Sequence, residues 1–396
     1  MKHFDQHKLL DQHQSAYRPN HSVETAPQHV YSSILHQLDR GRAVFLVLID
    51  LSAAFDTVSH DHLLSLLSSR FGIGGSVLRW IQSYLSGCLY RVKINNELSA
   101  PVQCNVGVPQ GSVLGPILFN CVMSVLPKLL RDIGIGCHTY ADDTQFWVSY
   151  NETGDFNDEE TARRRIKQAF GLISKFMNEN HLKLNPKKTQ FIPFSRKTKS
   201  VDFGPLVLSD DVSISPSSEV RNLGLTMDSD LNFHSHVSDL RKSCFFHLKR
   251  LKAIRCYIPK EQFATLIHAF ITSRLDFCNS LYYRLPNNLI TRIQTVQNAC
   301  AKCLTGRKKY DSATQARMDL HWLPIRARAS FKILVFAHRV VHSSSSPYYL
   351  SSAFSTTKHT RDTRNNRANT LKGTFDCRLT TVGARSIYIT LRELWN

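Results

Sequence analysis

The feature that most constrains the fold is an uninterrupted apolar run, AVFLVLI over residues 43–49, that ends directly in Asp50. A short apolar run without alternation is typical of a strand that is buried on both faces. A second segment, IGCHTYADDTQFWVSY over residues 135–150, has two β-type runs around Asp142 and Asp143. This pattern predicts a β-hairpin with an acidic turn. The core must therefore form around a central strand that ends in a carboxylate.

The remaining segments mix helical and strand patterns, which predicts an α+β fold. Helices are expected over residues 25–40, 60–70, 75–86, 116–130 and 158–180, and strands at LKLN, TQFIPF and VRNLGLTMD. From residue 236 the β-type signal fades, and helices are expected over residues 237–257, 260–273, 286–305 and 325–341. Residues 343–357 have the composition of a linker.

The positive charge of the chain lies in its C-terminal part. The 396 residues contain 50 Lys and Arg against 31 Asp and Glu, a formal charge of +19. Residues 1–235 hold 23 of each sign, so residues 236–396 hold 27 cations against 8 anions. A cationic helical region beside a neutral one predicts a polyanionic partner, and nucleic acid is the natural candidate. A solvated basic surface without a partner is the alternative.

The sequence shows no membrane or export signal. Its apolar runs are too short or too interrupted to span a bilayer, and its start, MKHFDQHKLLDQHQ, lacks the apolar core of a secretory signal. We therefore expect no membrane partner and an intracellular protein, in cytoplasm or nucleus, with its ten cysteines reduced. Cys300 and Cys303 form one CxxC pair without a second pair at zinc-ribbon spacing, so thiols buried in a helix are expected.

Asp50, Asp142 and Asp143 predict a metal site. If the strand and the hairpin are neighbours in one sheet, the three carboxylates lie within a few ångströms of one another. Their repulsion would raise their pKa values and destabilise the fold unless cations bind, and two Mg²⁺ ions about 3.5–4 Å apart use such ligands. Two-metal sites of this kind support phosphoryl transfer. Ordinary turn chemistry, in which Asp is common, is the alternative for the acidic pair alone.

Five blocks resemble those of a reverse transcriptase, in the order of that family. FLVLIDLSAAFDTVSHDHL is similar to the first catalytic block, GVPQGSVLGPILF to the Gln-Gly substrate block and YADD to the catalytic hairpin, and NHLKLNPKKTQFI and VRNLGLTMDSDLNF to the next two. HQSAYRPNHSVETA and DLHWLPIRARASFKILVFAHR resemble, more narrowly, the enzymes of LINE-type non-LTR retrotransposons. YADD alone is a weak signal, but the ordered set covers about residues 12–396.

The resemblance implies a ligand set for the metal ions. Asp50, Asp142 and Asp143 would hold two Mg²⁺ ions, which Mn²⁺ can replace, and the Leu51 carbonyl would be a backbone ligand.

The resemblance also implies substrate-binding residues. Phe55 would be the aromatic gate that clashes with a ribose 2′-hydroxyl and so favours deoxynucleotides. Gln110 and Gly111 would lie along the incoming nucleotide, where a backbone without Cβ permits close approach. Tyr140 would contact the primer end, and Lys188 would neutralise or protonate the leaving pyrophosphate. A core phenylalanine, a plain loop glycine, a hairpin tyrosine and a solvated lysine are the alternatives.

The architecture that the resemblance implies is a right-hand polymerase. A partial fingers segment would occupy residues 1–42, a palm of antiparallel sheet and packed helices with inserted fingers helices residues 43–235, a basic α-helical thumb residues 236–342, and a linker and tail residues 343–396. The thumb would hold template and primer by their phosphates through Arg241, Lys242, Lys249, Arg250 and Lys252.

The expected function is an RNA-directed DNA polymerase that uses an RNA template, a DNA primer and deoxynucleoside triphosphates. The chain begins after the first fingers blocks of the family and lacks the endonuclease domain that usually precedes them, so we expect an N-terminally truncated copy. A catalytically impaired fragment that only binds nucleic acid is the alternative. An RNA-dependent RNA polymerase is a third hypothesis, against which Phe55 and the LINE-like flanks argue.

Overall fold

The computed structural model describes residues 2–152, 156–196, 203–343, 346–357, 370–373 and 382–396. The chain forms two compact units. The first contains residues 1–22 and 42–217, and the second contains residues 23–41 and 218–396. These units divide the chain at other positions than the four predicted regions, whose bounds stay predictions.

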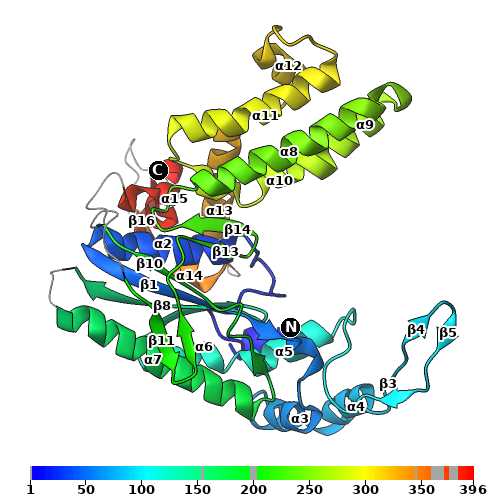
Figure 1. Ribbon diagram of the computed structural model, residues 1–396, viewed down its shortest axis with the longest axis vertical. Coiled ribbons are helices and arrows are strands. Elements are labelled where there is room, and N and C mark those ends of the chain that lie inside the picture. The colour runs from blue at the N-terminus through cyan, green and yellow to red at the C-terminus, as the bar shows by residue number, and fades with distance from the viewer. Residues whose placement is uncertain (1, 153–155, 197–202, 344–345, 358–369, 374–381) are drawn as a thin grey trace. The chain divides into compact units, whose positions relative to one another are not determined.

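A four-stranded antiparallel sheet forms the centre of the first unit (Figure 1). Its strands lie in the order β10 (Gln190–Phe194), β1 (Arg42–Ile49), β8 (Asp143–Asn151) and β7 (Gly136–Tyr140). β1 has a neighbour on each side, and its residues 43–47 are buried, which explains the absence of polar alternation. The predicted central strand and the predicted hairpin are confirmed.

Helix α7 (Phe156–Glu179) packs on β8 and on β11 (Leu206–Ser209). Its apolar residues recur at helical spacing and are buried in the core of the first unit, namely Ile166, Phe170, Ile173, Phe176 and Met177. This stripe confirms the predicted helix over residues 158–180.

The stretch that was predicted as one helix over residues 116–130 forms two helices, α5 (Gly115–Met123) and α6 (Leu126–Asp132). Pro127 explains the break, because its ring would clash with the carbonyl of residue 123 in a continuous helix. In the structure Pro127 lies in the first turn of α6, where no amide donor is needed. The prediction of one helix was therefore wrong.

Shorter elements complete the first unit. Its helices are α1 (Lys2–Gln6), the 3₁₀ turn η1 (Ala54–Asp56), α3 (His60–Ser69) and α4 (Gly75–Leu85). Its two-stranded ribbons pair β2 (Leu51–Ser52) with β9 (Lys183–Leu184), β3 (Leu89–Tyr90) with β6 (Val102–Gln103), β4 (Lys93–Ile94) with β5 (Glu97–Leu98), and β11 with β12 (Val212–Ile214).

The second unit is largely helical, as the fading β-type signal predicted. It begins with α2 (Thr25–Asp39), whose Pro27 lies in the first turn. The main helices after it are α8 (His234–Ile254), α9 (Lys260–Ile267), α10 (Ser273–Asp276), α11 (Asn287–Thr305), α12 (Ala313–Asp319) and α13 (Ile325–His342). Short connections are η2 (Arg255–Tyr257), the π-helical η3 (His268–Thr272) and η4 (Asn279–Tyr282). The segment VRNLGLTMD forms a hairpin of β13 (Glu219–Asn222) and β14 (Leu225–Asp228).

The end of the chain is folded where the structure describes it. Its elements are α14 (Tyr348–Ser351), β15 (Phe354–Thr357), β16 (Thr370–Gly373), η5 (Gly383–Arg385) and α15 (Ile387–Trp395). Ile387 and Leu391 of α15 belong to the same buried cluster as Ile333 and Phe336 of α13. Part of the stretch expected to be linker and tail therefore contributes to the core of the second unit.

The described helices include none that is long and apolar enough to cross a membrane. The nine cysteines in the described part of the chain are free thiols. Cys300 is buried and Cys303 is half-buried on α11, in agreement with thiols packed in a helix.

Gly136 gives a test of the packing in the central sheet. It pairs with Trp147, and a Cβ added to it would lie 2.4 Å from the indole Nε1 and Cε2 atoms. We expect Gly136→Ala to lower the free energy of unfolding by about 1–3 kcal/mol, because the indole must leave its place. Urea denaturation measures this change.

Gly171 provides the matched control. It lies inside α7 with nothing within 4 Å of an added Cβ. Gly171→Ala should raise the free energy of unfolding by about 0.5–1 kcal/mol, because alanine restricts the unfolded chain and favours a helix. Equal effects of the two substitutions would contradict the close approach at Gly136.

Candidate active site

The pairing of β1 with β8 brings the three predicted carboxylates to one end of the sheet. Ile49 pairs with Thr144 in antiparallel register, so the adjacent residues Asp50 and Asp143 are level with each other. Asp142 lies in the two-residue turn between β7 and β8. Level positions on neighbouring antiparallel strands have Cβ atoms about 4.5–5.5 Å apart. The sheet register therefore gathers carboxylates that are distant in the sequence.

The carboxylates repel one another, and their pKa values show it. Burial raises the pKa of Asp142, and the charge of Asp50 raises it further. Burial also raises the pKa of Asp143 to about 6, with added contributions from the charges of Asp142 and Asp50. Part of the Asp143 side chain remains exposed, so solvent screens some of this repulsion.

The three carboxylates do not form a closed ligand set, because their ligand atoms are not all within 4.8 Å of one another.

Lys188 and Asp50 form an ion pair at this end of the sheet. The Lys188 Nζ atom lies 3.3 Å from Oδ2 of Asp50, and the lysine side chain is 67% exposed. The Asn185 N–H donates a hydrogen bond of 3.0 Å to the Asp50 carbonyl, which holds the turn before Lys188 against the strand end. This Oδ2 atom is buried, and within the described residues its contact with Lys188 is an ion pair without the geometry of a hydrogen bond. Three carboxylates with such an oxygen are a donor set that fits a divalent cation.

Phe55 lies in η1, directly after β2. Its half-buried ring stacks on the buried ring of Phe119 from α5, with centroids 4.3 Å apart and an interplanar angle of 24°. The Phe55 carbonyl accepts a hydrogen bond of 2.8 Å from the Val108 N–H. Backbone and ring are thus both held, and the part of the ring that is not buried faces solvent. Its role as a gate stays a prediction.

Gln110 and Gly111 lie in the loop that follows Val108. The Gln110 Nε2 atom donates a hydrogen bond of 2.8 Å to Oδ1 of Asp56, so this loop is tied to η1. Gly111 has a φ of +80°, and no atom lies within 4 Å of an added Cβ. The backbone conformation alone therefore favours glycine at this position.

Two further predicted residues lie beside the acidic turn. Tyr140 is half-buried at the end of β7, and burial raises its pKa, with a smaller contribution from Tyr17. Leu51 is buried in β2, where it pairs with Leu184. The structure thus collects Asp50, Leu51, Tyr140, Asp142, Asp143 and Lys188 around one end of the sheet.

The N-terminal segment holds the acidic turn through Gln14, a residue that the sequence reasoning missed. The buried Gln14 Oε1 accepts a hydrogen bond of 3.1 Å from the Ala141 N–H, and its Nε2 donates a longer one of 3.4 Å to the Ala141 carbonyl. Ala141 has a φ of +57°, a left-handed conformation that is costly for alanine. The Ser15 N–H donates to the Thr139 carbonyl at 3.0 Å, which joins the segment to the edge of β7. No local pattern in the sequence marks Gln14.

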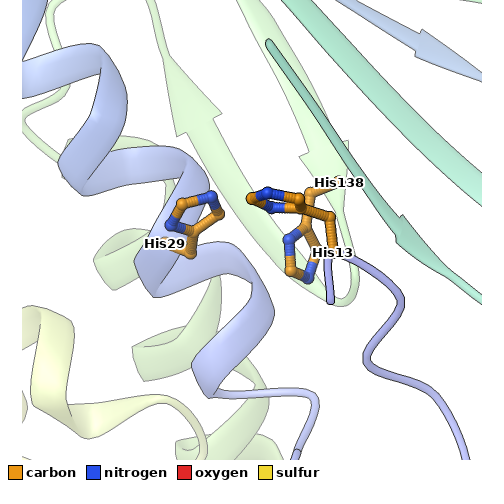
Figure 2. A group of neighbouring side chains, drawn as sticks. All are labelled: His13, His29 and His138. Carbon is orange, nitrogen blue, oxygen red and sulfur yellow. The ribbon is translucent and has the colours of Figure 1, made fainter. Parts of the chain in front are cut away.

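Two histidine side chains, the half-buried His13 and the buried His138, lie close together in the first unit (Figure 2). The rings of His13 and His138 meet edge to face, with centroids 6.2 Å apart. The Ser15 Oγ atom lies 2.9 Å from Nε2 of His138. Burial, followed by the charge of Arg131, lowers the pKa of His13 to about 4, so this ring is neutral at physiological pH. Figure 2 also draws His29, which belongs to α2 of the second unit.

The residues predicted to bind nucleic acid lie on α8 of the second unit. All five side chains are exposed, namely Arg241, Lys242, Lys249, Arg250 and Lys252. The Arg241 and Arg250 guanidinium groups lie 5.2 and 5.4 Å from the ring centroids of Phe245 and Phe246. The binding role of these residues stays a prediction.

The comparisons with known proteins agree on one family. The model of the family described as "Reverse transcriptase (RNA-dependent DNA polymerase)" matches residues 1–227. The chain is 27% identical over 326 residues to "Probable RNA-directed DNA polymerase from transposon BS" of Drosophila melanogaster, and 21% identical over 325 residues to "RNA-directed DNA polymerase from mobile element jockey" of Drosophila funebris. Each match covers 79% of this chain and 34% of the relative, so the chain spans about a third of the length of these relatives.

Among solved structures, apo telomerase from Candida tropicalis matches with a TM-score of 0.45 and 14% identity. The match covers 86% of this chain and 52% of that chain.

Gln14→Leu tests whether the two hydrogen bonds between Gln14 and Ala141 stabilise the acidic turn. It should lower the free energy of unfolding by about 1–3 kcal/mol, because the N–H and C=O groups of the buried Ala141 lose their partners. Chemical denaturation measures the change. Gln82→Leu, at an exposed position of α4, is the control and should change stability by no more than about 0.5 kcal/mol. If both variants are equally stable, the hydrogen bonds of Gln14 do not contribute to the free energy of unfolding.

Asp143→Asn tests the charge repulsion in metal-free buffer. The raised pKa means that the folded state holds this proton more tightly than the unfolded state. The unchanged protein should therefore lose stability as the pH rises from the ordinary Asp range through about 6. The variant should be the more stable protein at about pH 8, and the gap should close toward about pH 4. Thermal unfolding across this range measures the gap.

Asp211→Asn, at an exposed turn position, is the control and should show no such gain. A gap between the Asp143 variant and the unchanged protein that stays constant with pH would contradict the repulsion.

Proposed function

The chain belongs to the reverse transcriptase (RNA-dependent DNA polymerase) family, and from this premise we propose that it is an RNA-directed DNA polymerase of a LINE-type non-LTR retrotransposon. The relatives named for transposons confirm the resemblance that its motifs carry. The observation that carries the proposal is the register of β1 and β8, which brings Asp50 level with Asp143 in the part of the chain that the family matches.

In the proposed reaction, a DNA primer is extended along an RNA template. The primer 3′-hydroxyl oxygen attacks the α-phosphorus of a deoxynucleoside triphosphate and forms a new P–O bond. The bond between this phosphorus and the bridging oxygen breaks, and pyrophosphate leaves with the electron pair. The hydroxyl proton is released as the new bond forms. Negative charge grows on both the attacking side and the leaving side of the phosphorus.

Asp50, Asp142 and Asp143 would hold two divalent ions, Mg²⁺ or Mn²⁺. Bound there, such ions supply Lewis-acid stabilisation of the attacking and leaving oxygens. The donor set supports this assignment, because it combines mutual repulsion with a buried Asp50 oxygen whose contact within the described residues is the ion pair with Lys188 and not a hydrogen bond. Gln14 would act as a positioning residue, since its hydrogen bonds set the backbone between Tyr140 and Asp142.

Three side chains would position the nucleotide. Phe55 would be the gate, and its stacking on Phe119 gives the ring the rigidity that steric exclusion of a 2′-hydroxyl requires. Gln110 would lie along the nucleotide on a loop tied to η1. Lys188 would balance the charge of the pyrophosphate, since its exposed ammonium already lies at the acidic end of the sheet. Tyr140 would contact the primer end.

The proposed architecture is a right hand. The four-stranded sheet and α7 would form the palm, α3 and α4 inserted fingers, and the helices from α8 onward the thumb. The exposed cations of α8 would grip the phosphates of the template–primer duplex without reading its sequence.

Primer extension tests the proposal. The full chain is incubated with a DNA primer annealed to an RNA template, deoxynucleotides and Mg²⁺ or Mn²⁺, beside Asp142→Asn and Asp143→Asn. Both variants should lose extension by about 10²-fold or more, because each removes a ligand of the reaction centre. Asp211→Asn should extend like the unchanged chain.

The same experiment separates the alternatives. Duplex binding that is equal in all proteins without any extension would replace the proposal with a nucleic-acid-binding fragment. A preference for ribonucleotides over deoxynucleotides would indicate an RNA polymerase and would remove the gate role of Phe55.

A further inference from the structure

The second unit contains a basic pocket of about 870 Å³ between the C-terminal ends of α8 and α11 and the start of α12. Six of its lining residues are cations, namely Lys252, Arg255, Lys302, Arg307, Lys308 and Lys309. We call these residues the cationic pocket. Its volume falls within the range of about 300–1,000 Å³ that is typical of ligand sites.

The cations face the pocket from three elements. Lys252 and Arg255 come from the end of α8 and from η2, and Lys302 comes from α11. Gly306 ends α11 with a φ of +73°, which turns the following chain back over the helix end. The Lys302 Nζ atom then donates a hydrogen bond of 2.7 Å to the Lys309 carbonyl, so the loop with the remaining cations is held in place.

The charge of the pocket is unbalanced. No aspartate or glutamate is among its lining residues. In the part of the chain that the structure describes, Arg307 is the one member whose side chain pairs with a carboxylate, Asp319 at 2.6 Å, and the Lys308 backbone N–H donates a hydrogen bond of 2.6 Å to Oδ2 of Asp311. Like charges on facing walls repel and raise the local positive potential, which favours the entry of an anion. Folding alone gives no reason to gather these side chains.

The lining indicates which anion fits. The amide N–H group of Asn298 can donate to phosphate oxygens, whereas the Thr295 hydroxyl already donates to the Arg292 carbonyl at 2.7 Å. No aromatic side chain on which a base could stack is among the lining residues. A duplex is stiff over tens of base pairs and presents its phosphates on a convex surface. A single strand bends and can place successive phosphates between facing walls. The geometry therefore favours a single strand over a duplex.

We propose that the cationic pocket binds the phosphates of a single nucleic-acid strand, independently of sequence. The proposal rests on the proposed function, from which it takes nucleic acid as the class of ligand. It adds a site that is distinct from the other cations of α8, because Arg241, Lys242, Lys249 and Arg250 do not line the pocket. The chain would thus hold a duplex along α8 and an unpaired strand in the pocket.

The test compares two triple variants of the full chain. R255Q/K308Q/K309Q removes three charges from the pocket, and R221Q/R292Q/R339Q removes three charges from the same unit outside the pocket. Binding of fluorescein-labelled oligouridylate and oligoadenylate is measured by anisotropy over a range of salt concentrations. Thermal unfolding of each variant shows that it is folded.

The pocket variant should bind both oligonucleotides at least about tenfold more weakly than the control variant at low salt. Its plot of log affinity against log salt should be shallower by about 2, because each lost phosphate contact of a single strand contributes about 0.7. Equal affinities and slopes in the two variants would overturn the proposal. A strong preference for one of the two sequences would also overturn it.

Cys303 reports directly on occupancy, because it lines the pocket and is half-buried. Oligouridylate should slow its alkylation by iodoacetamide in the R221Q/R292Q/R339Q control variant and should not slow it in the R255Q/K308Q/K309Q pocket variant. Protection by inorganic tripolyphosphate without protection by oligouridylate would overturn a strand as the ligand. Strand binding by the pocket in a chain that fails to extend primers would reject the polymerase proposal and support the pocket.

Discussion

The antiparallel pairing of β1 with β8 determines where chemistry can take place in the first unit. Burial of the apolar side chains of β1 stabilises this pairing, and a shift of one residue would turn every side chain to the opposite face. The register therefore cannot slip at low cost. Because it pairs Ile49 with Thr144, it also places Asp50 level with Asp143. Burial of the apolar side chains of β1 thus determines where Asp50 and Asp143 lie, at the strand end, where the carboxylates retain access to water.

Each unit contains a local cluster of like charges, and the two clusters have opposite signs. At the end of the sheet, burial and then the neighbouring carboxylates raise the pKa values of Asp142 and Asp143. In the second unit, six cations line one pocket without an acidic residue among its walls. Each cluster opposes folding, and a ligand of the other sign would relieve this repulsion. Cations at the first and phosphates at the second are the ligands that a nucleic-acid polymerase meets.

Local patterns predicted most elements, and of the failures one has a local cause whereas the others depend on contacts between distant segments. The apolar run at residues 43–49 and the stripe of α7 each carry a complete signal in a short window. The helix over residues 116–130 was predicted as continuous because its apolar composition outweighed Pro127. At the chain end, Ile387 and Leu391 are buried in one cluster with residues of α13. A local window of sequence does not contain this contact. The acidic residues were found from motif and position, whereas Gln14 was not.

The sequence by itself determined the central strand, the acidic hairpin and the excess of cations after residue 235, because each depends on residue type and short-range spacing. The tertiary structure alone decided that Gln14 holds Ala141, that Lys188 pairs with Asp50, and that six cations meet around one pocket. These contacts join residues that are distant along the chain. Their geometry is set by how the sheet and the helices pack, and packing is a property of all the buried surfaces together, which no single segment specifies.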